Sequence, residues 1–185
     1  LWFMFKRDIL FHLERWKDDT HRKPLILRGA RQVGKTTVVN EFGKQFDNYL
    51  YLNLEKREAA SLFELNVSLK DLMPLFFAHC GKIRNEGTIL LFIDEIQNSA
   101  KAVALLRYFY EELPDIYVIA AGSLLENLID VRVSFPVGRV QYMALRPCSF
   151  REFLGAVGEE PLLSVLDKPE ITLAFHDLSL IHISE

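Results

Sequence analysis

The chain has 185 residues, half hydrophobic and a quarter charged, a composition typical of a globular domain with a substantial core. The formal net charge of −3 and a pI near 6.0 do not indicate a nucleic-acid or membrane-surface partner. No apolar run approaches the roughly 18 residues that span a bilayer. With only two cysteines and no signal-peptide pattern, the chain is expected in the cytoplasm.

Helical and extended patterns alternate along the sequence. Ile9, Leu13 and Trp16 recur at helical spacing and predict an amphipathic helix near the start. Ser149 and Glu152 form a capping-box pattern that opens a helix near the end. Apolar runs with the length of buried strands lie at residues 25–27, 49–54, 88–93, 117–121 and 140–145. Helical patterns separate them at residues 36–46, 58–64, 69–80 and 100–113. The alternation predicts an α/β domain with a mostly parallel central sheet of about five strands.

The segment after the first predicted strand carries the Walker A pattern, G-x-x-x-x-G-K-[ST]. Its residues are Gly29, Ala30, Arg31, Gln32, Val33, Gly34, Lys35 and Thr36, followed by Thr37. Gly29 and Gly34 permit a backbone whose N–H groups point at phosphate oxygens, and the next helix N-terminus adds donors. Lys35 supplies a charge to the β- and γ-phosphates, and the Thr36 hydroxyl can ligate Mg²⁺. The segment predicts a P-loop NTPase three-layer domain whose residues 29–37 bind a nucleotide.

The third predicted strand is followed by two carboxylates, Asp94 and Glu95, in the form of a Walker B motif. A buried strand would bring Asp94 beside the loop, where it can hold the hydration shell of Mg²⁺ opposite Thr36. Glu95 is then the residue expected to orient and polarise the attacking water. The second carboxylate favours hydrolysis over nucleotide binding alone.

Two further residues are candidates for the catalytic set. Ser123 follows the fourth predicted strand, at the sheet edge where ligands of open α/β sheets bind, and it also suits the N-cap of a helix at 124–128. Arg139 precedes the fifth strand, and its guanidinium suits a transferring phosphate in its own chain or in a neighbour's site. The alternative for Arg139 is a surface pair with a carboxylate such as Asp130.

Five motifs in this order resemble a family of bacterial and archaeal AAA+-like ATPases, in which a P-loop domain precedes a C-terminal domain of unknown function. The matching stretches are residues 27–37, 92–97, 121–125, 135–140 and 147–154. The resemblance implies ATP and Mg²⁺ as ligands. It also implies functional roles for Lys35, Thr36, Asp94 and Glu95, for Ser123 as a sensor, and for Arg139 as a sensor or arginine finger.

The resemblance also predicts the domain organisation. Residues 4–156 correspond to the ATPase domain, and residues 157–185 to the truncated start of the second domain. The tail 178–185 resembles translated adapter sequence, and a genuine alternating strand is the competing interpretation. The leading hypothesis is Mg²⁺-dependent ATP hydrolysis, with a nucleotide-gated interaction module of little turnover as the alternative. A protein partner and an oligomer stay open.

Overall fold

The computed structural model describes residues 7–122, 136 and 138–166, which divide into two compact units. The larger unit is Ile9–Pro147, and the described part of the smaller unit comprises Arg7, Asp8 and residues 148–166. The features predicted at Ser123, at residues 124–128 and in the tail 178–185 lie outside the described residues. The domain boundary predicted between residues 156 and 157 stays a prediction.

Strands and helices alternate in the larger unit as the sequence predicts. The strands are β1 (Leu25–Arg28), β2 (Asn48–Asn53), β3 (Ile89–Asp94), β4 (Ile116–Gly122) and β5 (Gln141–Ala144). The helices are α1 (Ile9–Asp18), α2 (Lys35–Gly43), α3 (Arg57–Glu64), α4 (Leu69–His79), the 3-10 helix η1 (Ile96–Asn98) and α5 (Ala100–Glu112). All five predicted strands are confirmed. Helix α2 ends before the predicted residue 46, because residues 44–46 make tighter i to i−3 hydrogen bonds.

The five strands form one parallel sheet in the order β2-β3-β4-β1-β5, which confirms the predicted fold class. Because the strands are parallel, their ends define two edges. The carboxyl edge holds Arg28, Asp94 and Gly122, and the amino edge holds Leu25 and Gln141. After β1 the chain continues to β2, the outermost strand on one side of the sheet. After β4 it passes β1 and continues to β5, the outermost strand on the other side. Ligands of open α/β sheets bind at such divergence points, on the carboxyl edge.

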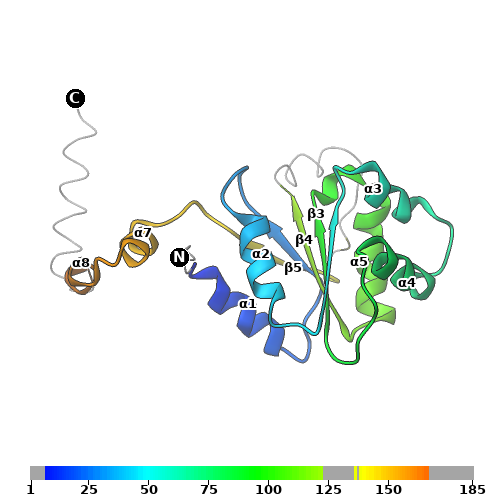
Figure 1. Ribbon diagram of the computed structural model, residues 1–185, viewed down its shortest axis with the longest axis horizontal. Helices are drawn as coiled ribbons and strands as arrows, with labels where there is room; N and C mark the ends of the chain where they lie inside the picture. The colour runs from blue at the N-terminus through cyan, green and yellow to red at the C-terminus, as the bar shows by residue number, and fades with distance from the viewer. Residues whose placement is uncertain (1–6, 123–135, 137, 167–185) are drawn as a thin grey trace. The chain divides into compact units, whose positions relative to one another are not determined.

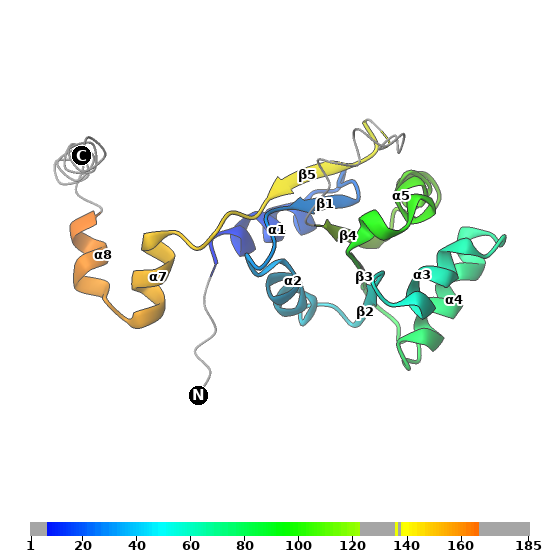
Figure 2. The ribbon, with the colours of Figure 1, turned by 90° about the horizontal axis from the view of Figure 1, so that it is seen from above.

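Helices cover both faces of this sheet and give the larger unit three layers, with α1 and α2 on one side and α3, α4 and α5 on the other (Figures 1 and 2). Strand β3 shows how each face is filled. Leu90 and Phe92 join the cluster that contains α1 and α2, while Leu91 and Ile93 join the cluster that contains α3, α4 and α5. All four side chains are fully buried. A strand buried on both faces therefore appears in the sequence as a continuous apolar run.

The smaller unit contains helices α7 (Phe150–Val157) and α8 (Glu160–Leu166). The predicted capping box of α7 is confirmed: the Glu152 amide donates to Ser149 Oγ at 3.1 Å, and the Ser149 amide donates to Glu152 Oε2 at 2.8 Å. Glu152 Oε1 accepts from Arg7 Nε and from the Asp8 amide, both at 2.9 Å. The Glu152 carboxylate thereby accepts hydrogen bonds from both chain segments of this unit.

Candidate functional site

The loop at residues 29–34 joins β1 to α2 at the carboxyl edge. Two positions in this loop require glycine, each for a different steric reason. A Cβ on Gly29 would lie 2.4 Å from the carbonyl oxygen of Leu145, closer than real Cβ contacts allow. Gly34, the N-cap of α2, has a φ of 93°, in the left-handed region that favours glycine. The start of the loop, directly after β1, therefore lies in tight backbone contact with Leu145, the residue that follows β5.

Lys35 is the first residue of α2 and turns back onto this loop. Its Nζ donates to the carbonyl oxygens of Gly29 and Ala30, each at 2.8 Å, and the residue is 6% exposed. Burial lowers the pKa of Lys35, while the Glu95 and Asp94 carboxylates oppose that shift and Arg31 adds to it. The ammonium is thus held at the loop, in the electrostatic range of both acidic residues.

Thr36 and Asp94 connect the loop to the end of β3. Thr36 Oγ1 donates to Asp94 Oδ2 at 2.8 Å, across a sequence separation of 58 residues. Asp94 is 4% exposed, and Oδ1 accepts from the Glu95 amide at 3.1 Å. Burial raises the pKa of Asp94, and the hydrogen bond from Thr36 opposes part of that rise. The structure therefore brings together the two residues that the sequence predicts as Mg²⁺ ligands.

Tyr51 joins this pair, although nothing in the sequence analysis selected it. The Tyr51 hydroxyl donates to Asp94 Oδ2 at 3.2 Å from the neighbouring strand β2. Burial and the adjacent Asp94 carboxylate raise the pKa of Tyr51 to about 12, so the hydroxyl remains a donor at neutral pH. The sequence signal that could have identified Tyr51 is its position as a polar residue close to the carboxyl end of a buried strand.

Glu95 follows β3 in a left-handed conformation with a φ of 52°. For a residue other than glycine this conformation is uncommon, and it is found at functional sites. The carboxylate of Glu95 accepts a hydrogen bond from Nε2 of Gln97, which lies in η1. Gln97 is the second residue of the site that the sequence analysis did not select.

Arg139 does not reach this site. Its Nε donates to Glu111 Oε1 at 3.0 Å, and Arg107 donates to the same carboxylate. Hydrogen bonds from Arg139, which has the larger effect, and from Arg107 lower the pKa of Glu111. Arg139 also precedes Gln141, the first residue of β5, whose partner Leu25 begins β1. The phosphate-binding loop begins beyond the other end of β1, about 13 Å from Leu25 at roughly 3.3 Å per residue.

This placement does not support the expected role of Arg139 at the γ-phosphate of its own chain, and that role stays a prediction to be tested by substitution. A residue that precedes a parallel strand lies at the amino edge, whereas the phosphate loop lies at the carboxyl edge. Arg139 instead forms a surface ion pair, as the alternative prediction described, and its partner is Glu111. The alternative partner Asp130 lies outside the described residues.

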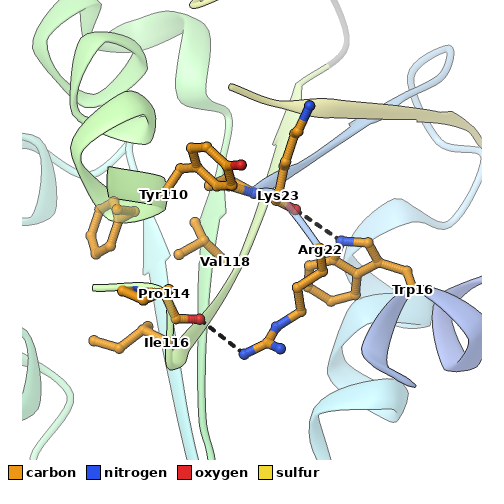
Figure 3. A pocket seen from close by; sticks show the side chains of 9 residues that line it. Trp16, Arg22, Lys23, Tyr110, Pro114, Ile116 and Val118 are labelled. Carbon is orange, nitrogen blue, oxygen red and sulfur yellow. Dashed lines mark hydrogen bonds between the residues drawn. The ribbon is translucent and has the colours of Figure 1, made fainter. Parts of the chain in front are cut away.

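A small hollow at the amino edge is separate from this site (Figure 3). Trp16, Arg22, Lys23, Tyr110 and Pro114 are among the residues that line it. Trp16 Nε1 donates to the Lys23 carbonyl at 2.9 Å, and an Arg22 guanidinium nitrogen donates to the Pro114 carbonyl at 3.0 Å (Figure 3). Its volume of about 10 Å³ is enough for a single water molecule. We interpret it as a packing gap.

Two features are absent from the described residues. No helix in that part of the chain is long and apolar enough to cross a membrane. Within the same residues, no group of three or more His, Cys, Asp or Glu side chains could hold a metal ion. A P-loop Mg²⁺ needs fewer protein ligands, because phosphate and water oxygens complete its coordination.

Many solved structures share this fold, and two of them illustrate the similarity. The Walker-type ATPase PABY2304 of Pyrococcus abyssi matches with a TM-score of 0.55 and 19% identity, over 90% of this chain and 61% of that one. The Orc1 protein of Aeropyrum pernix in complex with DNA matches with a TM-score of 0.50 and 18% identity, over 82% and 48%. This chain therefore spans about three-fifths and about half of their lengths. No curated protein sequence gave a significant match.

The parallel α/β sheet and these neighbours show that the domain has a P-loop NTPase-like fold. A family model for the AAA domain matches residues 21–154, which cover all of the strands described above. The chain belongs to the AAA domain family.

Proposed function

We propose that this chain binds ATP with Mg²⁺ at residues 29–37 and hydrolyses the bond between the β- and γ-phosphates. The hydrogen bond between Thr36 and Asp94 is the observation that carries the proposal, because it joins the two predicted motifs at the carboxyl edge. Family membership supports a nucleotide-binding, ATPase-type function. Hydrolysis and its dependence on Mg²⁺ are our inference from the residues gathered there.

In this proposal the loop amides and Lys35 bind the phosphates. Lys35 Nζ is fixed on two loop carbonyls, so it needs little reorganisation to donate to a phosphate oxygen. Thr36 and Asp94 fit Mg²⁺, since a hydroxyl and a carboxylate are the oxygen ligands that this ion takes in such sites. Bound Mg²⁺ would neutralise charge on the phosphates. Tyr51 would keep the Asp94 carboxylate in place.

Glu95 acts on the nucleophile. It accepts a proton from a water molecule whose oxygen bonds to the γ-phosphorus, while the bond from that phosphorus to the β–γ bridging oxygen breaks. The bridging oxygen leaves on ADP, and the other product is inorganic phosphate. The left-handed backbone at Glu95 supports this role, because it turns the residue out of β3 directly after Asp94.

The proposal is tested by release of inorganic phosphate from ATP, with Mg²⁺ and with excess EDTA, alongside calorimetric measurement of ATP binding. We expect turnover that requires Mg²⁺. Binding without turnover would support the alternative, a nucleotide-gated interaction module. The DNA in the Aeropyrum pernix structure belongs to that protein, and DNA binding is not part of this proposal.

Tyr51→Phe is expected to weaken Mg²⁺ activation of turnover by about 10-fold, the lower end of the range for residues that orient a metal ligand. The change removes only the hydroxyl that donates to Asp94 Oδ2 and keeps the ring that stacks on Phe92. The measurement is a Mg²⁺ titration of phosphate release at saturating ATP. Tyr108→Phe, an exposed tyrosine on α5, is the matched control. An unchanged Mg²⁺ midpoint would show that Tyr51 does not orient Asp94.

Arg139→Ala is expected to keep turnover within about twofold of the wild type, because the residue makes an exposed surface pair. Phosphate release per molecule should also stay constant on dilution. A large loss of rate, with rescue when Arg139→Ala is mixed with Lys35→Ala, would instead indicate that Arg139 serves a neighbouring molecule's site. Glu111→Gln separates the two outcomes, since it removes the ion pair and leaves the arginine in place.

A further inference from the structure

Arg31 is a second cation of the phosphate loop, beside Lys35. Its side chain is exposed and forms no hydrogen bond or ion pair with any residue in the described part of the chain. Arg28, at the end of β1, differs in this respect, because its guanidinium lies 4.0 Å from the ring centroid of Tyr142. The donors of the Arg31 guanidinium are therefore available to a ligand of the loop.

The backbone places Arg31 close to the Lys35 ammonium. The Ala30 carbonyl that accepts from Lys35 Nζ at 2.8 Å shares one planar peptide group with the Arg31 amide. Standard bond lengths therefore put the Arg31 Cα within about 7 Å of Lys35 Nζ, a distance that an arginine side chain can span. The next residue, Gln32, has a φ of 64°, a conformation that is uncommon outside glycine and is found at functional sites. The chain thus changes direction directly after Arg31.

Arg31 and Lys35 carry like charges and interact electrostatically. Burial is the main cause of the lowered pKa of Lys35, and Arg31 lowers that pKa further. Two cations this close favour a ligand whose negative charge lies within reach of both. Asp94 and Glu95 do not supply that charge in the proposed site, since bound Mg²⁺ would offset theirs. The phosphates of a nucleotide would supply it.

We propose that the Arg31 guanidinium binds the γ-phosphate of ATP and stabilises the charge that develops there during hydrolysis. The Lys35 ammonium has three N–H donors and directs two of them at loop carbonyls, so one remains for a phosphate oxygen. The planar fork of Arg31 adds the donors that a transferring phosphoryl group requires. Arg31 keeps all of its protons, and the bonds that form and break are those of the proposed hydrolysis. The inference rests on the proposed function and adds a catalytic residue to it.

The position of Arg31 in the sheet suits this role. Arg31 follows β1 at the carboxyl edge, whereas Arg139 precedes β5 at the amino edge and pairs with Glu111. A donor in the same loop as the phosphate-binding amides needs little reorganisation when charge develops on the γ-phosphate. Arg31 is therefore expected to act within the chain that carries it.

The test uses the whole chain with Arg31→Ala and Arg31→Lys. For Arg31→Ala we expect kcat to fall by roughly 10²-fold or more, the scale for losing one donor that stabilises transition-state charge. The dissociation constant of ADP, which lacks the γ-phosphate, should stay within about twofold. The dissociation constant of ADP with aluminium fluoride, which mimics the transferring group, should rise by a factor similar to the loss of kcat. Arg31→Lys should recover only part of both losses, since an ammonium lacks the planar fork.

Chemical rescue separates a direct contact from a structural effect. Added guanidinium ion, at concentrations that leave the thermal unfolding midpoint unchanged, should raise the kcat of Arg31→Ala several-fold and leave that of the wild type unchanged. Arg84→Ala is the matched control, at an exposed arginine in the loop that precedes β3. This variant should change none of the constants.

A kcat of Arg31→Ala within about twofold of the wild type overturns the inference. Weakening of ADP and of the aluminium fluoride complex by the same factor, without rescue, does so as well, because it indicates a damaged loop. If the wild-type chain binds ATP without turnover, the proposed hydrolysis is wrong and binding decides the inference. It then stands if Arg31→Ala weakens the aluminium fluoride complex but not ADP, and any other pattern overturns it. A wild-type chain that binds no nucleotide overturns both the proposed function and the inference.

Discussion

Lys35→Ala is expected to lower the affinity for ATP by roughly 10²-fold, since a charge-assisted hydrogen bond contributes about 2–3 kcal/mol and each 1.4 kcal/mol is tenfold. Lys35 is 6% exposed, and its ammonium donates to the carbonyls of Gly29 and Ala30. Its removal takes away the buried cation at the loop and leaves both carbonyls without that donor. Calorimetry with ATP and Mg²⁺ measures the effect.

Two variants separate the lost charge from a damaged loop. Lys44→Ala removes a lysine just beyond the other end of α2, where it pairs with Glu41 at the surface, and it should bind ATP as the wild type does. Lys35→Met keeps most of the buried aliphatic volume and loses only the ammonium. An affinity close to that of the wild type in Lys35→Met would show that the loop amides alone hold the phosphates. The P-loop interpretation would be wrong if Lys35→Ala also left the affinity unchanged.

The parts of this site that could be predicted from sequence are those encoded in short stretches. The loop at residues 29–36 is recognised from glycine at fixed positions. The left-handed backbone at Gly34 is a local requirement, whereas the close approach to Leu145 that requires glycine at position 29 becomes visible only in the structure. Strand β3 was identifiable because burial on both faces demands an uninterrupted apolar run, and Asp94 follows at its end. Neither inference needs the order of the strands in the sheet.

The parts that could not be predicted depend on that order or on a local turn. Tyr51 contacts Asp94 only because β2 lies beside β3, with Asn53 in register with Asp94. Gln97 reaches Glu95 through a left-handed residue and a 3-10 turn, and no pattern in the sequence signals that turn. Arg139 shows a different limit, because the family resemblance suggested its role. Its place before a parallel strand already indicated the amino edge.

Glu95→Gln is expected to slow hydrolysis by roughly 10²-fold or more, the usual scale for removing a positioned general base. The substitution keeps the shape of the side chain and an oxygen that can still accept from Gln97 Nε2. It removes the basicity needed to accept a proton from water. Thr36, Asp94 and Lys35 are untouched, so ATP and Mg²⁺ should bind as in the wild type.

The Glu95→Gln result is decisive when binding and turnover are measured on the same preparation. Calorimetry gives the affinity for ATP, and phosphate release gives kcat; a loss confined to kcat assigns Glu95 to the chemical step. Glu64→Gln, at an exposed carboxylate paired with Lys101, is the matched control and should change neither. Hydrolysis at the wild-type rate would show that another group activates the water. A parallel loss of affinity would instead indicate that the Glu95 carboxylate, which opposes the lowering of the Lys35 pKa by burial, supports the binding site itself.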